Sequence, residues 1–86
     1  MNAAERLKEW GCEGVVVFTD FGYDSALIGV TLDNRAVYDF DKMVDWLRFN
    51  QGFEYDEAVE WIDYNTLKVI SYAGRNAPII MQRLPE

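Results

Sequence analysis

The spacing of apolar residues changes near residue 40, and this change limits the fold more than any other feature. Residues 15–38 are rich in β-branched side chains separated by turn formers, which is typical of strands. Between residues 40 and 70, apolar side chains recur at intervals of three and four, which is typical of helices packed on a core. The sequence therefore predicts an α+β fold in which a sheet precedes two core-facing helices.

The first half predicts one helix and three strands. A short amphipathic helix over residues 2–10 stops at Gly11. The strands form an antiparallel meander with a tight turn at Asp33 and Asn34. Their ranges are residues 15–18, 26–32 and 35–38, and the first is apolar on both faces, as in a central strand.

The second half predicts two helices and a last strand. Asp39 is a good N-cap for a helix that ends near residue 50, where Gly52 supplies a left-handed residue. A longer helix covers residues 55–70, with a break at residues 65–66. Residues 78–81 form an edge strand, because proline cannot donate a ladder hydrogen bond. The predicted order is αβββααβ, a small antiparallel sheet packed against two or three helices.

Length and composition fit one folded domain over residues 1–86. The longest unbroken apolar run, residues 15–18, is far shorter than the roughly 20 residues that a membrane span needs. Residues 1–10 lack the apolar core of a secretory signal, and Cys12 has no second cysteine to pair with. We therefore expect a cytoplasmic location.

Charge is the strongest compositional signal. The chain holds 15 acidic and 8 basic residues and no histidine, for a formal net charge of -7. Such a surface repels nucleic acid and membranes and is attracted to basic protein grooves. A charge of this size also serves solubility alone. One cysteine without histidine excludes the common catalytic triads and zinc fingers, so we expect neither an enzyme nor a cofactor.

The acidic residues fall on the outer faces of the two predicted helices. Asp56, Glu60 and Asp63 share one stripe opposite the apolar face of the longer helix. The helix dipole favours acids in the first turn, but mid-helix carboxylates repel one another. The candidate partner-binding residues are Asp41, Asp45, Glu54, Asp56, Glu57, Glu60, Trp61, Asp63 and Tyr64.

Four aromatic residues lie outside the apolar stripes of their helices: Trp46, Phe49, Trp61 and Tyr64. We expect packing to bury most of them. Any that stays exposed beside the acids is a candidate interface anchor, because tryptophan and tyrosine dominate binding hot spots. Tyr23 is a further candidate. A separate group, Asp20, Asp24, Asp39 and Asp41, flanks strand ends and could hold a hard cation, although turn formation and capping explain each residue singly.

Three stretches, residues 38–43, 57–66 and 77–80, form a pattern that resembles small proteins encoded by phages and prophages of Gram-positive bacteria. Here Ser71 replaces the proline more typical of that pattern. A small, acidic protein without catalytic residues is also similar in type to anti-CRISPR inhibitors, several of which mimic the charge of DNA.

These observations lead to three hypotheses. The first is an inhibitor whose acidic helical face occupies a basic nucleic-acid-binding groove of a host defence nuclease, such as a Cas effector. The second is a structural or regulatory phage protein that acts through a protein-protein interface, which could be a homodimer. The third is a metal-binding protein that uses the aspartate group.

Overall fold

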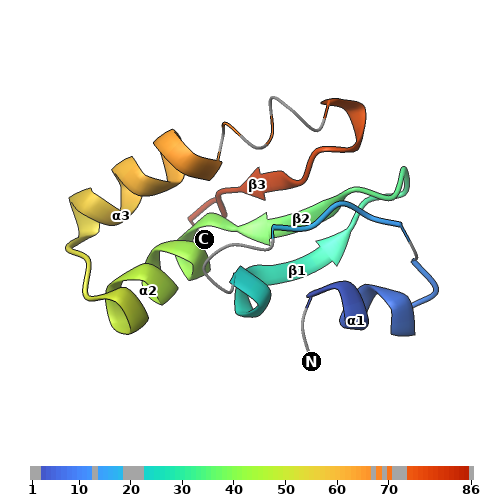
Figure 1. Ribbon diagram of the computed structural model, residues 1–86, viewed down its shortest axis with the longest axis horizontal. Helices are drawn as coiled ribbons and strands as arrows, with labels where there is room; N and C mark the ends of the chain where they lie inside the picture. Colours follow the sequence, from blue (N-terminus) through green and yellow to red (C-terminus); the bar gives the residue numbers. More distant parts are fainter. Residues whose placement is uncertain are drawn as a thin grey trace.

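The computed structural model describes residues 3–12, 14–18, 23–66, 68, 70 and 74–85, and within them it has an α+β fold with a three-stranded sheet (Figure 1). The α-helices and strands are α1 (Ala3–Glu9), β1 (Leu27–Val30), β2 (Ala36–Asp39), α2 (Phe40–Gln51), α3 (Tyr55–Trp61) and β3 (Ile79–Met81). Single turns of other helix types are η1 (Tyr23–Ala26), η2 (Ile62–Thr66) and η3 (Gly74–Asn76). The predicted fold class is confirmed.

The sheet is mixed rather than antiparallel. Its strand order is β1-β2-β3, in which β1 and β2 form the predicted hairpin and β3 lies at the predicted edge. β3 nevertheless runs parallel to β2, with Val37 opposite Ile79. The reason is the connection: the chain leaves β2 directly into α2 and α3 and returns, and a crossover of this length allows a parallel return. In the hairpin turn, Asn34 has a φ of 63°, a left-handed conformation that asparagine tolerates.

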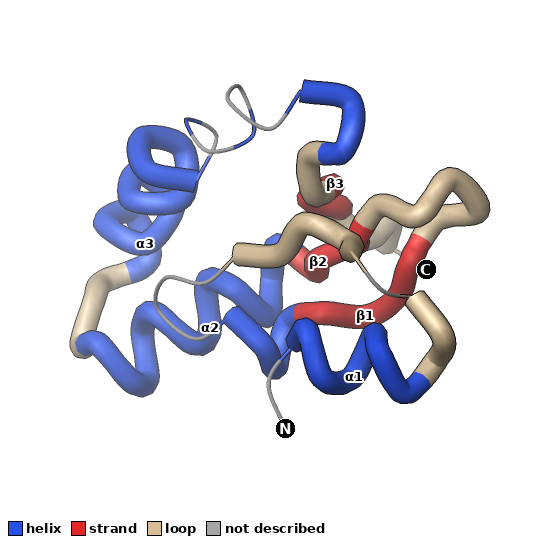
Figure 2. The backbone as a smooth tube through the Cα atoms, turned by 45° about the vertical axis from the view of Figure 1, so that its right-hand side comes forward, coloured by secondary structure: helices blue, strands red, loops and turns tan. Residues whose placement is uncertain are grey.

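The predicted strand at residues 15–18 is wrong, so the observed strand and α-helix order is αββααβ. This segment runs beside β2 without joining the sheet (Figures 1 and 2). The backbone N–H of Phe18 donates to the hydroxyl of Tyr38 over 3.1 Å, and the two rings pack 4.8 Å apart. An apolar β-branched run suits any buried extended segment, and here a side-chain hydroxyl replaces a ladder partner.

Two capping residues set the limits of α2, as predicted. The side chain of Asp39 accepts a hydrogen bond from the backbone N–H of Lys42, and Gly52 adopts a left-handed conformation with φ of 73°. Between these caps, Met43 and Leu47 are fully buried. The buried hydrophobic cluster of the described residues joins α1, the 14–18 segment, the sheet and α2 with Ala58 and Ile62. α2 is thus the central helix of the core and holds α3 against it.

The expected long helix changes its winding part-way. α3 ends at Trp61 and continues as the π turn η2, with Lys68 and Ile70 helical beyond it. The predicted break at residues 65–66 falls within this turn, and the Asn65 side chain donates to the Trp61 carbonyl over 3.3 Å. Such a side-chain bond competes with the regular helix ladder. The turn expected at residues 72–74 lies largely outside the described residues.

α1 lies beside β1, at the other end of the molecule from α3 (Figures 1 and 2). Arg6 fixes it there, because its guanidinium donates to the carbonyls of Asp24 and Leu27 over 2.6 and 3.0 Å. The molecule therefore has an end formed by α1 and the hairpin, and an end formed by α2 and α3.

Candidate protein-binding surface

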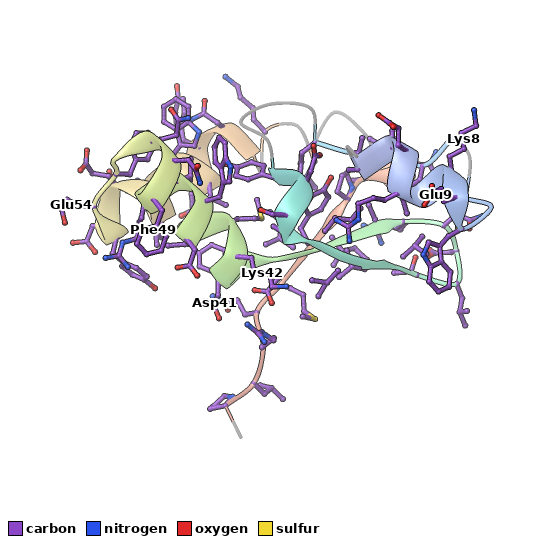
Figure 3. The ribbon with its side chains drawn as sticks, turned by 90° about the horizontal axis from the view of Figure 1, so that it is seen from below. Lys8, Glu9, Asp41, Lys42, Phe49 and Glu54 are labelled. Atoms are coloured by element: carbon purple, nitrogen blue, oxygen red, sulfur yellow. The ribbon has the colours of Figure 1, made fainter. Side chains whose placement is uncertain are left out.

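All seven acidic candidates are exposed, as their positions on the predicted helices require. Five of them follow one another on α3 and its continuation, and we call this group the acidic face: Glu54, Asp56, Glu57, Glu60 and Asp63. Asp41 and Asp45 lie on α2 instead. Asp41 lies in the first turn of α2, whereas Glu54 lies beyond the other end of that helix (Figure 3). The structure therefore brings the five together and leaves Asp41 apart from them.

The acidic face has no basic residue within it. No lysine or arginine occurs between Arg48 and Lys68. Within the described ranges, the five carboxylates form no ion pair; the salt bridge that is present joins Asp39 to Arg83. Two of the five have a local role, since Glu54 and Glu57 form a capping box at the start of α3, in which the Glu57 carboxylate accepts the backbone N–H of Glu54 over 3.1 Å. Asp56, Glu60 and Asp63 have no part in this capping box.

An open groove lies along the acidic face, with a volume of about 940 Å³. Its aromatic wall contains Trp61 and Tyr64, which were predicted, and Phe53, which was not. The rings of Phe53 and Trp61 meet edge to face with centroids 5.5 Å apart. The remaining lining residues are Glu57, Glu60, Asp63 and Asn65. The groove thus combines an apolar wall with a carboxylate rim.

Sequence reasoning missed Phe53 because it precedes the helix and belongs to no periodic stripe. A signal was present, because Phe53 immediately precedes Glu54, the N-cap of α3. An apolar side chain at this position often packs back on its helix. Asn65 was expected only to interrupt the helix. It also lines the groove, and its side chain donates to the Trp61 carbonyl.

The four flanking aromatic residues divide into two pairs. Trp46 and Trp61 are half-buried against the core, and Trp46 packs 5.9 Å from Tyr23. Phe49 and Tyr64 are 77% and 73% exposed. Only two of the four side chains are therefore packed against the core, and the expectation that most of them would be buried is not met. Tyr23 is itself buried, so its proposed role as a surface anchor is wrong.

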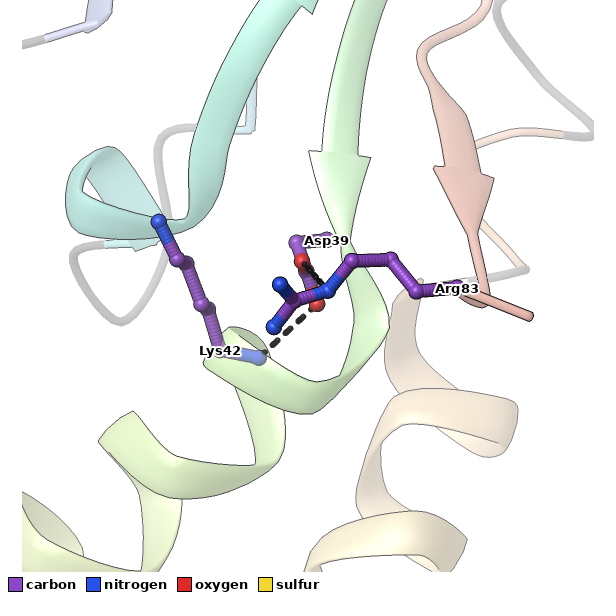
Figure 4. A network of polar contacts seen from close by, with 3 residues as sticks. All are labelled: Asp39, Lys42 and Arg83. Atoms are coloured by element: carbon purple, nitrogen blue, oxygen red, sulfur yellow. Dashed lines mark hydrogen bonds and ion pairs between the residues drawn. The ribbon is translucent and has the colours of Figure 1, made fainter. Parts of the chain in front are cut away.

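The described members of the aspartate group proposed for a cation, Asp24, Asp39 and Asp41, are not assembled as a metal site. Asp39 is buried, and its carboxylate already accepts from Arg83 Nε over 2.8 Å and from the Lys42 backbone N–H over 3.2 Å (Figure 4). Across the residues that the structure describes, no three acidic or cysteine side chains gather as metal ligands do. Asp20 lies outside them. The Asp39 carboxylate serves the fold, because it connects β2, α2 and the segment after β3.

A perturbed titration is found in the core rather than at this surface. Burial raises the pKa of the Tyr38 phenol above its usual value of 10.0, although the hydrogen bond from the Phe18 N–H acts in the opposite direction. Tyr38 is fully buried and is not one of the groove residues. Its titration therefore bears on stability rather than on binding.

No helix in the described ranges is long and apolar enough to cross a membrane. Comparison with protein-family models, with curated proteins and with solved structures gave no match to this chain.

Proposed function

We propose that this chain is an inhibitor whose acidic face occupies a basic nucleic-acid-binding groove of a host defence nuclease, such as a Cas effector. The observation that supports this most is the run of five exposed carboxylates without a basic neighbour in residues 54–63. The phage resemblance of residues 38–43, 57–66 and 77–80 directs the proposal to a defence nuclease. In this role the protein itself is not an enzyme and acts in the bacterial cytoplasm.

The charge density of the acidic face is close to that of nucleic acid. Within α3, Asp56, Glu57 and Glu60 span four residue steps at about 1.5 Å each, so three negative charges lie along roughly 6 Å of helix axis, or one charge per about 3 Å. One strand of B-DNA carries a phosphate per about 3.4 Å of helix axis. A groove that binds a phosphate backbone by its charge spacing can therefore accept this face.

Helix chemistry does not require all of these charges. Asp56 and Glu57 lie in the first turn of α3, where the helix dipole favours negative charge. Glu60 and Asp63 lie beyond that turn and repel each other and their neighbours. The π turn that carries Asp63 adds support, because single π turns occur frequently at functional sites.

The test is charge reversal on the stripe of the acidic face. Asp56→Lys, Glu60→Lys and Asp63→Lys in one variant should abolish inhibition of DNA cleavage by the target nuclease. Raising salt from about 0.05 to about 0.3 M should weaken inhibition by the wild type at least tenfold, because counterion release governs such binding. Cas effectors of Gram-positive bacteria are the first nucleases to assay.

A matched variant separates location from net charge. Glu5→Lys, Glu9→Lys and Asp33→Lys change the charge by the same amount at the α1 and hairpin end, where Glu9 lies far from Glu54 (Figure 3). This variant should inhibit like the wild type, and circular dichroism should show both variants folded. Unchanged inhibition by the acidic-face variant would refute the proposal.

A second candidate function is self-association of a structural or regulatory protein, and it is favoured by the α1 and hairpin end. There Trp10 and Ile28 line a groove beside strand β1, which is an edge of the sheet, and Trp10 is well exposed. Exposed edges and apolar side chains are common contact sites. Sedimentation that shows a dimer insensitive to salt and disrupted by Trp10→Ser would favour this function; a monomer would exclude it.

A further inference from the structure

The groove on the acidic face combines carboxylates with aromatic rings. Mimicry of phosphate charge alone would need only the carboxylates. Aromatic rings of Phe53, Trp61 and Tyr64 form its wall, and the carboxylates of Glu57 and Glu60 lie on the same groove. Glu57, Trp61 and Tyr64 follow at intervals of four and three residues, so one face of the helical segment carries both kinds. A ligand for this groove must suit an aromatic surface and a carboxylate at once.

Arginine meets both requirements better than lysine does. Its guanidinium is planar, so it stacks on an aromatic ring while its N–H groups reach a carboxylate in pairs. The lysine ammonium is a compact, strongly hydrated point charge, which matches the carboxylates but not the ring. Grooves that bind phosphate backbones contain both arginine and lysine. A preference of this surface for one of them can therefore be measured.

The Tyr64 ring already has one cation of this chain within cation–π distance. Lys68 Nζ lies 5.5 Å from the centroid of this ring, although carboxylates are close by in the same segment. Tyr64 is 73% exposed, so part of the ring is open to a second cation. Phe49 on α2 is a natural comparison, because Arg48 lies 5.7 Å from its centroid and it is as exposed as Tyr64, yet it is not a residue of this groove.

We propose that the groove formed by Phe53, Trp61, Tyr64, Glu57 and Glu60 receives an arginine side chain of the basic partner. The inference rests on the proposed function, and it names the group that the partner contributes. The guanidinium stacks on Tyr64 and bonds to the rim carboxylates, and the rest of the acidic face supplies the longer-range attraction. Binding therefore depends on an arginine of the partner at this groove, whereas either arginine or lysine serves along the rest of the acidic face.

The test compares two peptides of equal charge, octa-arginine and octa-lysine, binding to the full chain. Isothermal titration at about 0.15 M salt should show octa-arginine binding about threefold to fivefold more tightly, the range that an exposed cation–π contact gives. Tyr64→Leu should bring the two affinities together. Phe49→Leu, which removes an equally exposed ring outside the groove, should leave the preference unchanged.

Nuclear magnetic resonance gives a second readout that does not depend on affinity. Octa-arginine should shift the ring signals of Tyr64 and the indole N–H of Trp61, and should leave those of Phe49 in place. Equal affinities of the two peptides for the wild type would overturn the inference, as would a preference lost equally in the Phe49 and Tyr64 variants.

The outcome for the proposed function is separate. If both peptides bind equally and salt weakens both, charge alone acts; the arginine site is then wrong while the proposed function stands. If octa-arginine is preferred and the acidic-face reversal leaves nuclease inhibition unchanged, the groove is real and the proposed function fails. If neither peptide binds, the proposal of an arginine site is wrong.

Discussion

Replacing Glu60 with glutamine should make the protein more stable. Glu60 has negative neighbours at three helical distances: Asp56 four residues before it, Glu57 three before it and Asp63 three after it. Each such pair costs about 0.2–0.5 kcal/mol, so their removal should stabilise the fold by about 1 kcal/mol. For a chain of this size that gain corresponds to a rise in melting temperature of about 5 °C.

A matched substitution on α2 should have the opposite sign. Asp45 also sits mid-helix and is exposed, but it has positive neighbours three residues away on both sides, Lys42 and Arg48, and one negative neighbour, Asp41. Asp45→Asn therefore removes more attraction than repulsion and should lower the melting temperature by about 1–2 °C. Both substitutions make the same change in net charge.

Thermal unfolding followed by circular dichroism at low salt measures both effects. The gain from Glu60→Gln should shrink at about 0.5 M salt, because salt screens exposed charges. Equal gains from the two variants would show that the net charge of -7 sets stability as a whole, and the reasoning from local pairs would be refuted. A higher melting temperature for Glu60→Gln alone would mean that the acidic face lowers the stability of the fold. Such a cost is common for residues that serve binding.

Two further predictions concern the core. Asp39→Ala should lower the free energy of unfolding by about 1–2 kcal/mol, mostly through loss of the α2 cap. Arg83→Met should cost less than half as much, because the Arg83 side chain is 60% exposed and water both screens the pair and replaces it; equal losses in urea unfolding would contradict this. Burial raises the pKa of Tyr38, so the folded state holds the phenol proton more tightly than the unfolded state. The stability from this group is full below the unfolded value of 10.0 and is lost as the pH rises through the folded value. Urea unfolding between about pH 9 and 11 should show the loss in the wild type and a smaller one in Tyr38→Phe, and equal slopes would show that Tyr38 is not responsible.

Features with a local physical cause could be predicted from the sequence. Asp39 and Gly52 limit α2 because a capping side chain and a left-handed glycine act within one helical turn. The hairpin turn at Asp33 and Asn34 and the exposure of the acidic face follow in the same way from turn chemistry and helical periodicity. Of these features, the limits of α2 and the exposure of the acidic face belong to the end of the molecule that carries the candidate surface.

Features that depend on distant segments could not be predicted. Residues 15–18 look like a strand, but whether such a run joins a sheet depends on which edge is free, and Tyr38 instead supplies the partner for Phe18. The contact of Arg83 with Asp39 joins residues far apart in the sequence and has no local signal. Phe53 enters the groove only because the turn after α2 brings it against Trp61.

The parallel pairing of β2 with β3 also determines the order in which the protein can assemble. Arg35 Nε donates to the Ala77 carbonyl across 42 residues of chain, beside the paired strands. Closing a loop of that length costs about 3 kcal/mol of chain entropy, whereas the hairpin and α2 form from contacts between near neighbours. The sheet is therefore completed late in folding. We expect α2 and α3, which carry the acidic residues, to form before β3 closes the loop around them, so that their mutual repulsion opposes folding from its early stage.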